Sequence, residues 1–350
     1  MMPGLIEVVD GGIGNSIQDV GRIGYRHMGI TVSGALDAYL ARCANALVGN
    51  APQADCACIE IRGAGPTLAV REGPLRLALA GGIDATLQRA GGETRAVRAW
   101  ESVTLAVGDT LEVGYLPGGT AYLAVAGGID TPRQLGSRST YQRALIGGID
   151  GAPIATGQSL PCRALGCRDP REFQAAAPWS ANAEASAEGS ATLRVVLGPQ
   201  HGHFSEDALE RFLSAEFEVT TQIDRMGVRL QGEKLAHRTP QHADIVSDGV
   251  TPGAIQVPGS GQTIVLLADC QTVGGYPKIA TVISADLPLL AQLQAGQRVR
   301  FCAVDAAQAR EALRQRERAW NAWAYAIAFE LPGAAINRDL TAGWPLECGG

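Results

Sequence analysis

One segment in the second half of the chain gathers the residues best suited to electrostatic catalysis. It runs from Ala268 to Asp286 and contains Lys278, one of only two lysines in a 350-residue chain that has 27 arginines. Lysine offers a compact ammonium whose pKa moves readily on burial, so a site that needs a point cation cannot simply take arginine instead. The alternative is a lysine that caps a surface turn. Composition alone weighs these two interpretations evenly.

Two other segments carry polar residues that could join Lys278. One is Asp224-Arg225-Met226-Gly227, and the other runs from Ser247 to Pro258 and includes Asp248 and Gln256. The residues around them have the short apolar runs and glycine punctuation of strands. We therefore expect the three segments to form one polar constellation embedded in strands.

Two further polar clusters have both a structural and a functional interpretation. From Asn15 to Ser33, polar side chains and glycines alternate so closely that a continuous core strand could not accommodate them, and the pattern predicts a shaped loop. Ser137-Arg138-Ser139-Thr140 could bind an oxyanion through Arg138 and backbone amides, or it could cap a helix. The capping role is modestly favoured.

Several familiar site motifs are missing from the chain. There is no Gly-x-x-x-x-Gly-Lys-[Ser/Thr] loop, so any ATP site is of another kind. Gly-x-Ser-x-Gly is also missing, because Pro258 stands where the first glycine would precede Ser260, and a serine-hydrolase elbow is not predicted. His201 and His203 have no obvious third ligand nearby, so we expect no bound metal.

The composition predicts a mainly β protein with a few helices. Aromatic residues are scarce, and 44 glycines and 18 prolines punctuate short apolar runs, which favours many short strands and tight turns. The length suits two domains. The net charge of −6 and the lack of a lysine cluster exclude a nucleic-acid partner.

The N-terminus resembles a first strand and not a secretory signal. No run approaches the roughly 20 apolar residues that span a bilayer, so we expect a cytoplasmic protein with no membrane partner. The eight cysteines have neither zinc-ligand spacing nor a disulfide framework, and we expect buried free thiols.

Glycine pairs mark the turns of the first half. Gly-Gly-Ile-Asp recurs at residues 81–84, 127–130 and 147–150. Two copies directly follow apolar runs, so their glycines are expected to supply the positive φ of tight turns. Backbone nests for an anion are the less favoured alternative.

A polar stretch divides the chain into two domains. Residues 168–192 are rich in Asp, Pro, Ala, Glu and Ser without apolar periodicity, and predict a linker. We expect a first domain at 1–167, a second at 193–304, and a C-terminal helix and tail at 305–350. The other expected helices are 33–49, with Ser33 as N-cap, and 206–213, with Ser205 as N-cap.

A series of longer motifs resembles a single family. The motifs are Ser16-Ile-Gln-Asp-x-Gly-Arg-x-Gly-Tyr25, Ser33-Gly-Ala-x-Asp37, Leu47-Val-Gly-Asn50, Tyr122-Leu-Ala-Val-Ala-Gly-Gly-Ile-Asp130, Leu135-Gly-Ser-Arg-Ser-Thr140, Asp224-Arg-Met-Gly-x-Arg-Leu230, Gly253-Ala-Ile-Gln-Val-Pro258 and Gln271-Thr-x-Gly-Gly-Tyr-Pro-Lys-Ile-Ala-Thr-Val-Ile-x-Ala-Asp286. In this order, from residue 5 to about 304, they resemble the biotin-dependent carboxyltransferases. This family, also called allophanate hydrolase subunit 2, includes the C subunit of 5-oxoprolinase and the carboxyltransferase part of urea carboxylase.

The resemblance implies two packed cyclophilin-like β-barrel subdomains and a partner homologous to allophanate hydrolase subunit 1. The sequence departs from the family at two places. Val228 stands where tyrosine is usual, which would change one wall of the expected pocket. The tail beyond about residue 330 extends past the usual end of the family and would alter the partner interface.

The resemblance also implies a reaction at a small amide, lactam or urea group. Such reactions need cations beside a developing oxyanion, which assigns Lys278 and Arg225 as an electrostatic pair. Asp248 or Asp269 would transfer a proton or orient Lys278. Gln256 and Gln271 can each donate to and accept from an amide, although each could instead close a strand end. The remaining residues expected at the substrate are Thr272, Tyr276, Met226, Asp19 and Arg22.

Three functions are compatible with this resemblance. The first is the C subunit of an ATP-dependent 5-oxoprolinase, which with the A and B subunits would open 5-oxoproline to glutamate, using ATP with Mg²⁺ at the level of the complex. The second is the carboxyltransferase of a biotin-dependent urea or amide carboxylase. Its biotin would reside on another chain, because neither Lys234 nor Lys278 lies between two methionines. The third is a non-enzymatic regulator that binds a homologue of the B subunit.

Overall fold

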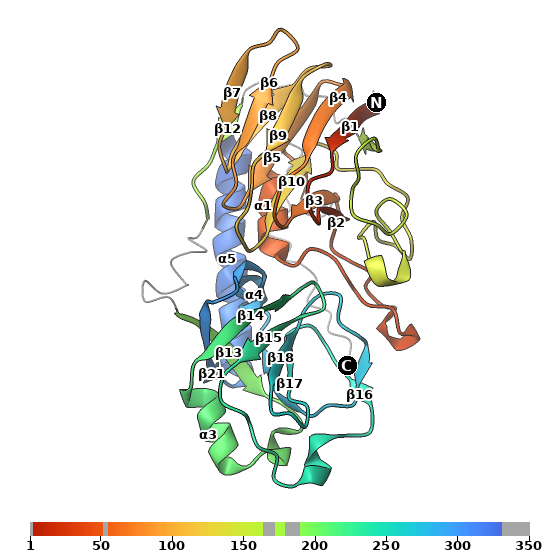
Figure 1. The fold of residues 1–350 in the computed structure, drawn as a ribbon. Coiled ribbons are helices and arrows are strands. Elements are labelled where there is room, and N and C mark those ends of the chain that lie inside the picture. The colour runs from red at the N-terminus through yellow and green to blue at the C-terminus, as the bar shows by residue number, and fades with distance from the viewer. Residues whose placement is uncertain (1–2, 52–54, 164–171, 179–189, 331–350) are drawn as a thin grey trace.

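Two β-rich units form the part of the chain that the computed structural model describes, residues 3–51, 55–163, 172–178 and 190–330 (Figure 1). Strands dominate both units, and helices lie on their surfaces, so the prediction of a mainly β fold with a few helices is confirmed. Within the described ranges, no helix is long and apolar enough to cross a membrane.

The first unit consists of two six-stranded sheets that enclose one apolar core. The first sheet has the order β11 (Ser159–Arg163), β1 (Pro3–Asp10), β4 (Thr67–Glu72), β9 (Thr110–Val113), β6 (Ala85–Gln88) and β7 (Thr94–Val97). The second sheet has the order β12 (Phe173–Gln174), β8 (Glu101–Leu105), β5 (Leu75–Ala80), β10 (Ala121–Val125), β3 (Cys58–Ile61) and β2 (Ser16–Gln18). Strand β12 falls within the predicted linker at 168–192 and pairs with β8. Part of that stretch therefore belongs to the first unit.

The central strands of the second sheet are buried on both faces. In β5, Leu77 and Leu79 enter the core between the sheets, whereas Ala78 and Ala80 face helix α1 (Ala38–Leu47). Alternate residues of a strand point to opposite faces, so this leucine–alanine pattern places bulk on one side and small side chains on the other. The small side chains allow α1 to pack closely on the sheet.

Helix α1 begins at Asp37 and not at the predicted cap, Ser33. The Asp37 carboxylate accepts a hydrogen bond from the Leu40 backbone N–H at 2.9 Å, which satisfies one donor of the first turn. Ser33 has a φ of 54° and donates its backbone N–H to the Ala268 carbonyl of the second unit. Serine and aspartate are both favourable N-cap residues. Because Ser33 is held by its contact with the second unit, Asp37 is the N-cap.

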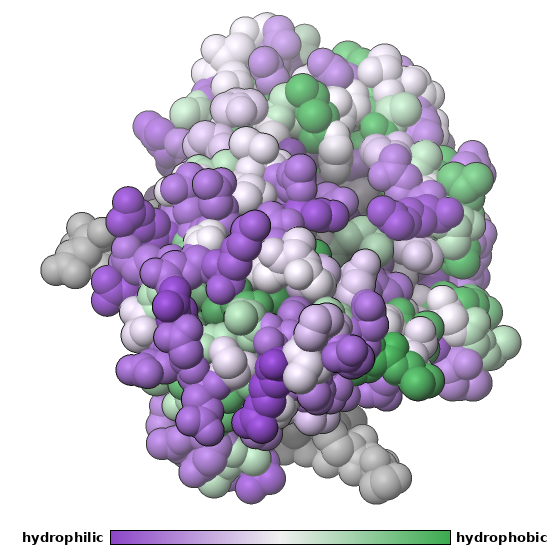
Figure 2. All heavy atoms as spheres, turned by 60° about the horizontal axis from the view of Figure 1, so that its bottom comes forward, coloured by the Kyte–Doolittle hydropathy of each residue, from purple (hydrophilic) through white to green (hydrophobic). Residues whose placement is uncertain are grey.

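The second unit is a closed seven-stranded barrel. Its order is β13 (Ser190–Leu197), β20 (Lys278–Val282), β17 (Ala254–Gln256), β18 (Thr263–Leu266), β15 (Gly227–Gln231), β14 (Phe217–Ile223) and β21 (Arg298–Ala303), and parallel pairing of β21 with β13 closes it. Helix α3 (Glu206–Ser214) begins at the predicted N-cap, Ser205, whose hydroxyl accepts from Ala208 N at 3.1 Å. Because apolar side chains point into the barrel, its outer face is mostly hydrophilic (Figure 2).

The remaining elements are short and lie around the barrel and between the units. They are β16 (Asp248–Gly249), β19 (Val273–Gly274), α4 (Leu287–Gln292) and the 3₁₀ turns η1 (Arg26–Met28), η2 (Gln142–Ala144), η3 (His201–His203) and η4 (Pro240–Ala243). Four cysteines are buried and free as predicted, namely Cys43, Cys58, Cys162 and Cys270. Cys302 is exposed and Cys56 is half-buried, which corrects the prediction for these two residues. Cys167 and Cys348 lie outside the described residues.

Helix α5 (Ala306–Glu330) follows the barrel and runs back along the first unit, which confirms the predicted C-terminal helix (Figure 1). Trp320 is buried against the first unit with the Arg42 guanidinium stacked 3.7 Å from its ring centroid. Glu317 accepts hydrogen bonds from Tyr39 and from both terminal nitrogens of Arg42. The chain beyond residue 330 lies outside the described residues.

Candidate functional site

Strands β2 and β3 of the first unit form one wall of the site. Residues 16–18 are a fully buried strand, so the prediction that residues 15–33 form only a loop is wrong at this point. Ile17 pairs with Ile59 and both enter the apolar core, while Ser16 pairs with Glu60 on the opposite face. Residues directly opposite in an antiparallel pair share a face. Gln18, two residues from Ser16, therefore lies on this polar face as well.

Arg225 of the second unit reaches this polar face and pairs with two carboxylates. Its Nη1 donates to Glu60 at 2.5 Å, and its Nε and Nη2 donate to Asp269 at 2.9 and 3.0 Å. Nη2 also donates to the Gly34 carbonyl at 2.6 Å. Burial alone would lower the pKa of Arg225, but attraction by Glu60 and Asp269 outweighs burial and raises it. The guanidinium therefore stays charged and joins the two units.

Glu60 is equally well satisfied. Besides Arg225, its carboxylate accepts from the Tyr122 hydroxyl at 2.6 Å and from the Leu36 backbone N–H at 2.9 Å. Burial raises the pKa of Tyr122 well above its ordinary value, and the charge of Glu60 adds to this effect. The tyrosine therefore stays a neutral hydrogen-bond donor to Glu60.

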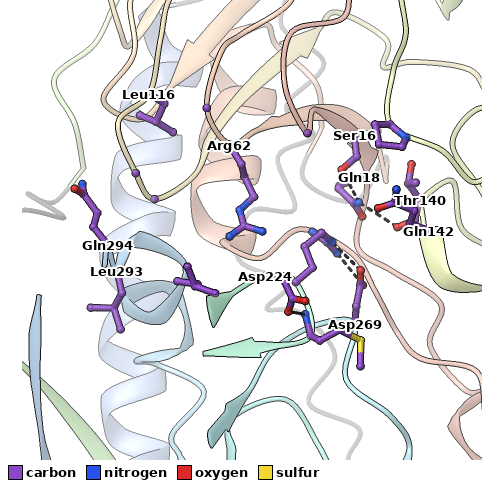
Figure 3. Close-up of a pocket in the computed structure, with 18 of the residues that line it drawn as sticks. Ser16, Gln18, Arg62, Leu116, Thr140, Gln142, Asp224, Asp269, Leu293 and Gln294 are labelled. Carbon is purple, nitrogen blue, oxygen red and sulfur yellow. Dashed lines mark hydrogen bonds and ion pairs between the residues drawn. The ribbon is translucent and has the colours of Figure 1, made fainter. Parts of the chain in front are cut away.

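A cavity of about 550 Å³ opens between the two units beside Arg225. Figure 3 shows Gln18 and Thr140 on the first-unit side, Asp224 and Asp269 on the second-unit side, and Arg62 extending between them. The charged side chains in its lining are Arg62, Arg143, Arg225, Asp224 and Asp269. Leu116, Pro117 and Leu293 supply apolar contact. The lining is therefore mostly polar with an apolar part, and its three arginines and two aspartates give a net charge of +1.

The Asp224 turn separates this cavity from a second one of about 430 Å³ at the mouth of the barrel. The Asp224 carboxylate accepts from Met226 N at 2.7 Å and Gly227 N at 3.1 Å, which fixes the turn. Asp224 and Met226 line both cavities. Gln256 and Gln271 line the second, where Gln271 Nε2 donates to Gln256 Oε1 at 3.3 Å.

Lys278 lies away from Arg225, in neither cavity's lining. Its Nζ donates to the Asp248 carboxylate at 2.7 Å and to the Gly249 carbonyl at 3.1 Å. The hydrogen bond from Lys278 holds the pKa of Asp248 below its ordinary value. Because Lys278 is buried and Asp248 is exposed, the pair anchors the two-stranded β16–β19 sheet onto the barrel. The electrostatic pairing of Lys278 with Arg225 and its catalytic role stay predictions.

The hydroxyl-rich turn at residues 137–140 binds an internal carboxylate. Asp19 accepts from the Ser137 and Ser139 hydroxyls at 2.6 and 2.5 Å and from Arg138 N at 2.5 Å. The turn therefore neither caps a helix nor offers these donors to a ligand. Buried Arg22 donates to the Ser139 carbonyl beside it, and burial lowers the pKa of Arg22 although Asp19 and Asp269 counteract this.

A comparison with known protein families shows which family this chain belongs to. Residues 28–303 match the family described as carboxyltransferase domain, subdomain A and B. This chain is a member of that carboxyltransferase domain family.

Individual relatives of the carboxyltransferase domain family agree. The 5-oxoprolinase C subunit of Escherichia coli K12 is 34% identical over 321 residues, covering 90% of this chain and 96% of that protein. Urea amidolyase of Saccharomyces cerevisiae is 31% identical over 318 residues, covering 85% of this chain and 16% of that protein. The crystal structure of Kluyveromyces lactis urea carboxylase superposes with a TM-score of 0.81 at 27% identity, over 92% of this chain and 29% of that one.

The carboxyltransferase domain brings only some of the predicted site residues together. Arg225 and Asp269 line the cavity between the units, Gln256, Gln271 and Tyr276 line the barrel-mouth cavity, and Met226 lines both. The predicted residues that line neither are Lys278, Asp248, Thr272, Asp19 and Arg22. Their assignments to catalysis or substrate binding stay predictions.

The sequence prediction missed Gln18, Arg62, Arg143 and Thr140 as cavity residues. Gln18 is visible in the sequence only through the alternation of Ser16-Ile-Gln18, a three-residue strand that glycines and polar residues surround. Val228 is buried in the barrel core and lines neither cavity, so the expectation that it changes a pocket wall is wrong. No group of three or more His, Cys, Asp or Glu side chains in the described ranges could hold a metal ion.

Proposed function

We propose that this chain is the C subunit of an ATP-dependent 5-oxoprolinase, where it helps to activate the lactam of 5-oxoproline for opening to glutamate. It would do so in complex with partners of the A and B types. The observation that carries the proposal is the extent of the match to the Escherichia coli 5-oxoprolinase C subunit, which spans nearly all of both proteins. The urea amidolyase and urea carboxylase relatives are several times longer than this chain.

The cavity between the units supports this chemistry. It combines cationic side chains with amide side chains in a partly enclosed space, and preorganised cations and donors stabilise a developing oxyanion most strongly where water is excluded. Arg225 is held rigidly by Glu60 and Asp269, which compensate its charge, so in this proposal it fixes the wall of the cavity and is not the free cation. Arg62 and Arg143 have no such partners among the described residues.

The cavity between the units offers little to a magnesium ion. Both oxygens of Asp269 accept from Arg225, and Asp224 uses one oxygen to hold its own turn, which leaves a single carboxylate oxygen where a hard cation prefers several oxygen ligands. We therefore derive no step through ATP within this chain. ATP with Mg²⁺ belongs, in this proposal, to the assembled complex.

The test is ADP release by this chain mixed with its A-type and B-type partners, with and without 5-oxoproline. Release that requires both the lactam and this chain is the expected result. Lactam-independent release, or none, would overturn the proposal. In the same assay, Lys278→Ala tests the predicted catalytic role of that lysine: loss of lactam-dependent turnover supports it, and full activity removes it.

The structural similarity to urea carboxylase favours carboxyl transfer as the second candidate function. In that case the chain would move a carboxyl group from a carboxybiotin carried by another protein to a urea or amide nitrogen. Carboxylated product formed from a carboxybiotin carrier without ATP turnover by A-type and B-type partners would identify it. Binding to a B-type partner without either activity would instead indicate the regulatory function.

A further inference from the structure

Gln18 presents an acceptor that the protein does not satisfy, in the wall of the cavity between the units. The side chain is fully buried, and its Nε2 donates to Ser16 Oγ at 3.0 Å and to the Thr140 carbonyl at 3.2 Å. A carbonyl only accepts, so the amide must turn its NH₂ toward Thr140. This fixes Oε1 as the atom with no hydrogen-bond partner. A buried acceptor without a donor is costly and calls for an explanation.

Arg62 presents an unpaired cation to the same cavity. It follows β3 directly, two residues after Glu60, and its half-buried side chain extends toward the Asp224 turn (Figure 3). It makes no hydrogen bond or ion pair with any described residue. Of the nearby carboxylates, Glu60 and Asp269 are paired with Arg225, and Asp224 accepts from the backbone of its own turn. Arginine is well suited to bind an incoming carboxylate with two parallel N–H donors.

We propose that this cavity binds a small cyclic amide that carries a carboxylate, with the carboxylate on Arg62 and the amide N–H on Gln18 Oε1. Its volume of about 550 Å³ lies within the range of small-molecule sites. The Thr140 hydroxyl, also buried without a partner, lines the same cavity and can serve as a further polar contact.

The inference rests on the proposed function, because 5-oxoproline is a five-membered lactam with a carboxylate. A cyclic urea that carries a carboxylate has the same two groups, so the site chemistry alone admits both. Three probes separate the contributions: 5-oxoproline, 2-oxoimidazolidine-4-carboxylate as the urea analogue, and 2-pyrrolidinone, which has the lactam but no carboxylate.

The experiment is calorimetric titration of these probes into the full chain, alone and in complex with its partners. We expect 2-pyrrolidinone to bind roughly tenfold or more weakly than 5-oxoproline, because it lacks the group that Arg62 would bind. Arg62→Met is expected to weaken the binding of 5-oxoproline by the same factor and to leave the binding of 2-pyrrolidinone unchanged. Arg62→Lys is expected to restore part of the affinity. Preference for the urea acid over 5-oxoproline would assign the same site to a ureido substrate.

Arg229→Met is the matched control, because it removes the same charge from the barrel-mouth cavity. It is expected to leave all three affinities unchanged. Gln18→Met removes the acceptor and is expected to weaken the binding of both lactams by the same factor. If the buried Gln18→Met substitution prevents folding, Arg62→Met still tests the inference. Equal binding of 5-oxoproline by wild type and Arg62→Met, or binding of no probe, overturns the inference.

The two proposals fail in distinguishable ways. If the complex turns over 5-oxoproline with an unchanged KM in Arg62→Met, the site assignment alone is wrong. If the complex does not use 5-oxoproline at all, the proposed function is wrong, and the Arg62 dependence of the binding titration still decides whether the cavity takes a carboxylate-bearing amide.

Discussion

Two arginines enter the cavity between the units from opposite sides and have opposite electrostatic surroundings. Arg225 comes from the barrel unit and is closed off by Glu60, Asp269 and the Gly34 carbonyl. Arg62 comes from the two-sheet unit and has no partner among the described residues. A cation whose charge is already compensated holds the architecture together. A cation that lacks compensation in the same cavity is available to a ligand.

Hydroxyl and amide groups show the same contrast. Around Asp19, the Ser137 and Ser139 hydroxyls and the Arg138 backbone N–H all donate to the buried carboxylate. One residue further along, the Thr140 hydroxyl is buried and unused, as is Gln18 Oε1. Asp19, Ser137 and Ser139 do not line the cavity, whereas Gln18 and Thr140 do. The two unsatisfied atoms therefore belong to residues of the cavity wall.

The largest expected effect separates the two arginines. Arg225→Met leaves Glu60 and Asp269 buried without a cation and is expected to lower the free energy of unfolding by about 3–5 kcal/mol. Arg62→Met removes the same charge but breaks no contact within the protein, so its effect is expected to stay within about 0.5 kcal/mol. Urea unfolding of the full chain measures both. Similar losses from the two variants would abolish the contrast.

A carboxylate that is hydrogen-bonded by uncharged donors at the same interface sharpens the comparison. Asp37 accepts from Leu40 N and from Gln292 Nε2 at 3.0 Å, and burial raises its pKa to about 6, because these donors and the charge of Arg316 only partly offset the loss of solvent. Its folded pKa exceeds the ordinary value, so the stability linked to its protonated form is present below about pH 4 and is lost as pH rises through about 6.

Asp37→Asn is expected to remove this pH dependence, since asparagine still caps the helix but does not titrate. Between about pH 4 and about pH 7.5, the unfolding free energy of the wild type should fall relative to that of the variant by on the order of 3 kcal/mol. If the unfolding free energies of the two proteins change with pH in parallel, burial does not raise the pKa of Asp37 and the prediction is wrong.

The smallest expected effect compares two adjacent side chains. Ser139→Ala removes a donor to Asp19 and the acceptor of Asp19 N, and is expected to cost about 1.5–3 kcal/mol. Thr140→Val replaces an unsatisfied hydroxyl with a methyl group of similar shape and is expected to be neutral or stabilising by up to about 1 kcal/mol. Thermal unfolding of both variants shows which of them loses more stability. If Thr140→Val is destabilising, the Thr140 hydroxyl has a hydrogen-bond partner within the protein.

Much of the fold could be predicted from local sequence. The apolar run before Gly81 and the N-cap at Ser205 depend on neighbouring residues, and the structure confirms both. The site was predictable only in part, because its main contacts are distant in sequence: Arg225 and Glu60 are 165 residues apart. The segment at residues 15–33 was expected to be a loop because a three-residue strand carries too little periodicity to identify itself.

The contact between α1 and α5 has a consequence for how the chain is made. Tyr39 and its partner Glu317 are separated by 278 residues, so on a ribosome adding about 5–20 residues per second, α1 waits on the order of 15–55 seconds for the helix that covers it. During that interval the apolar side chains that pack against Trp320 are not yet covered. We therefore expect the nascent first unit to be prone to aggregation until α5 has been synthesised.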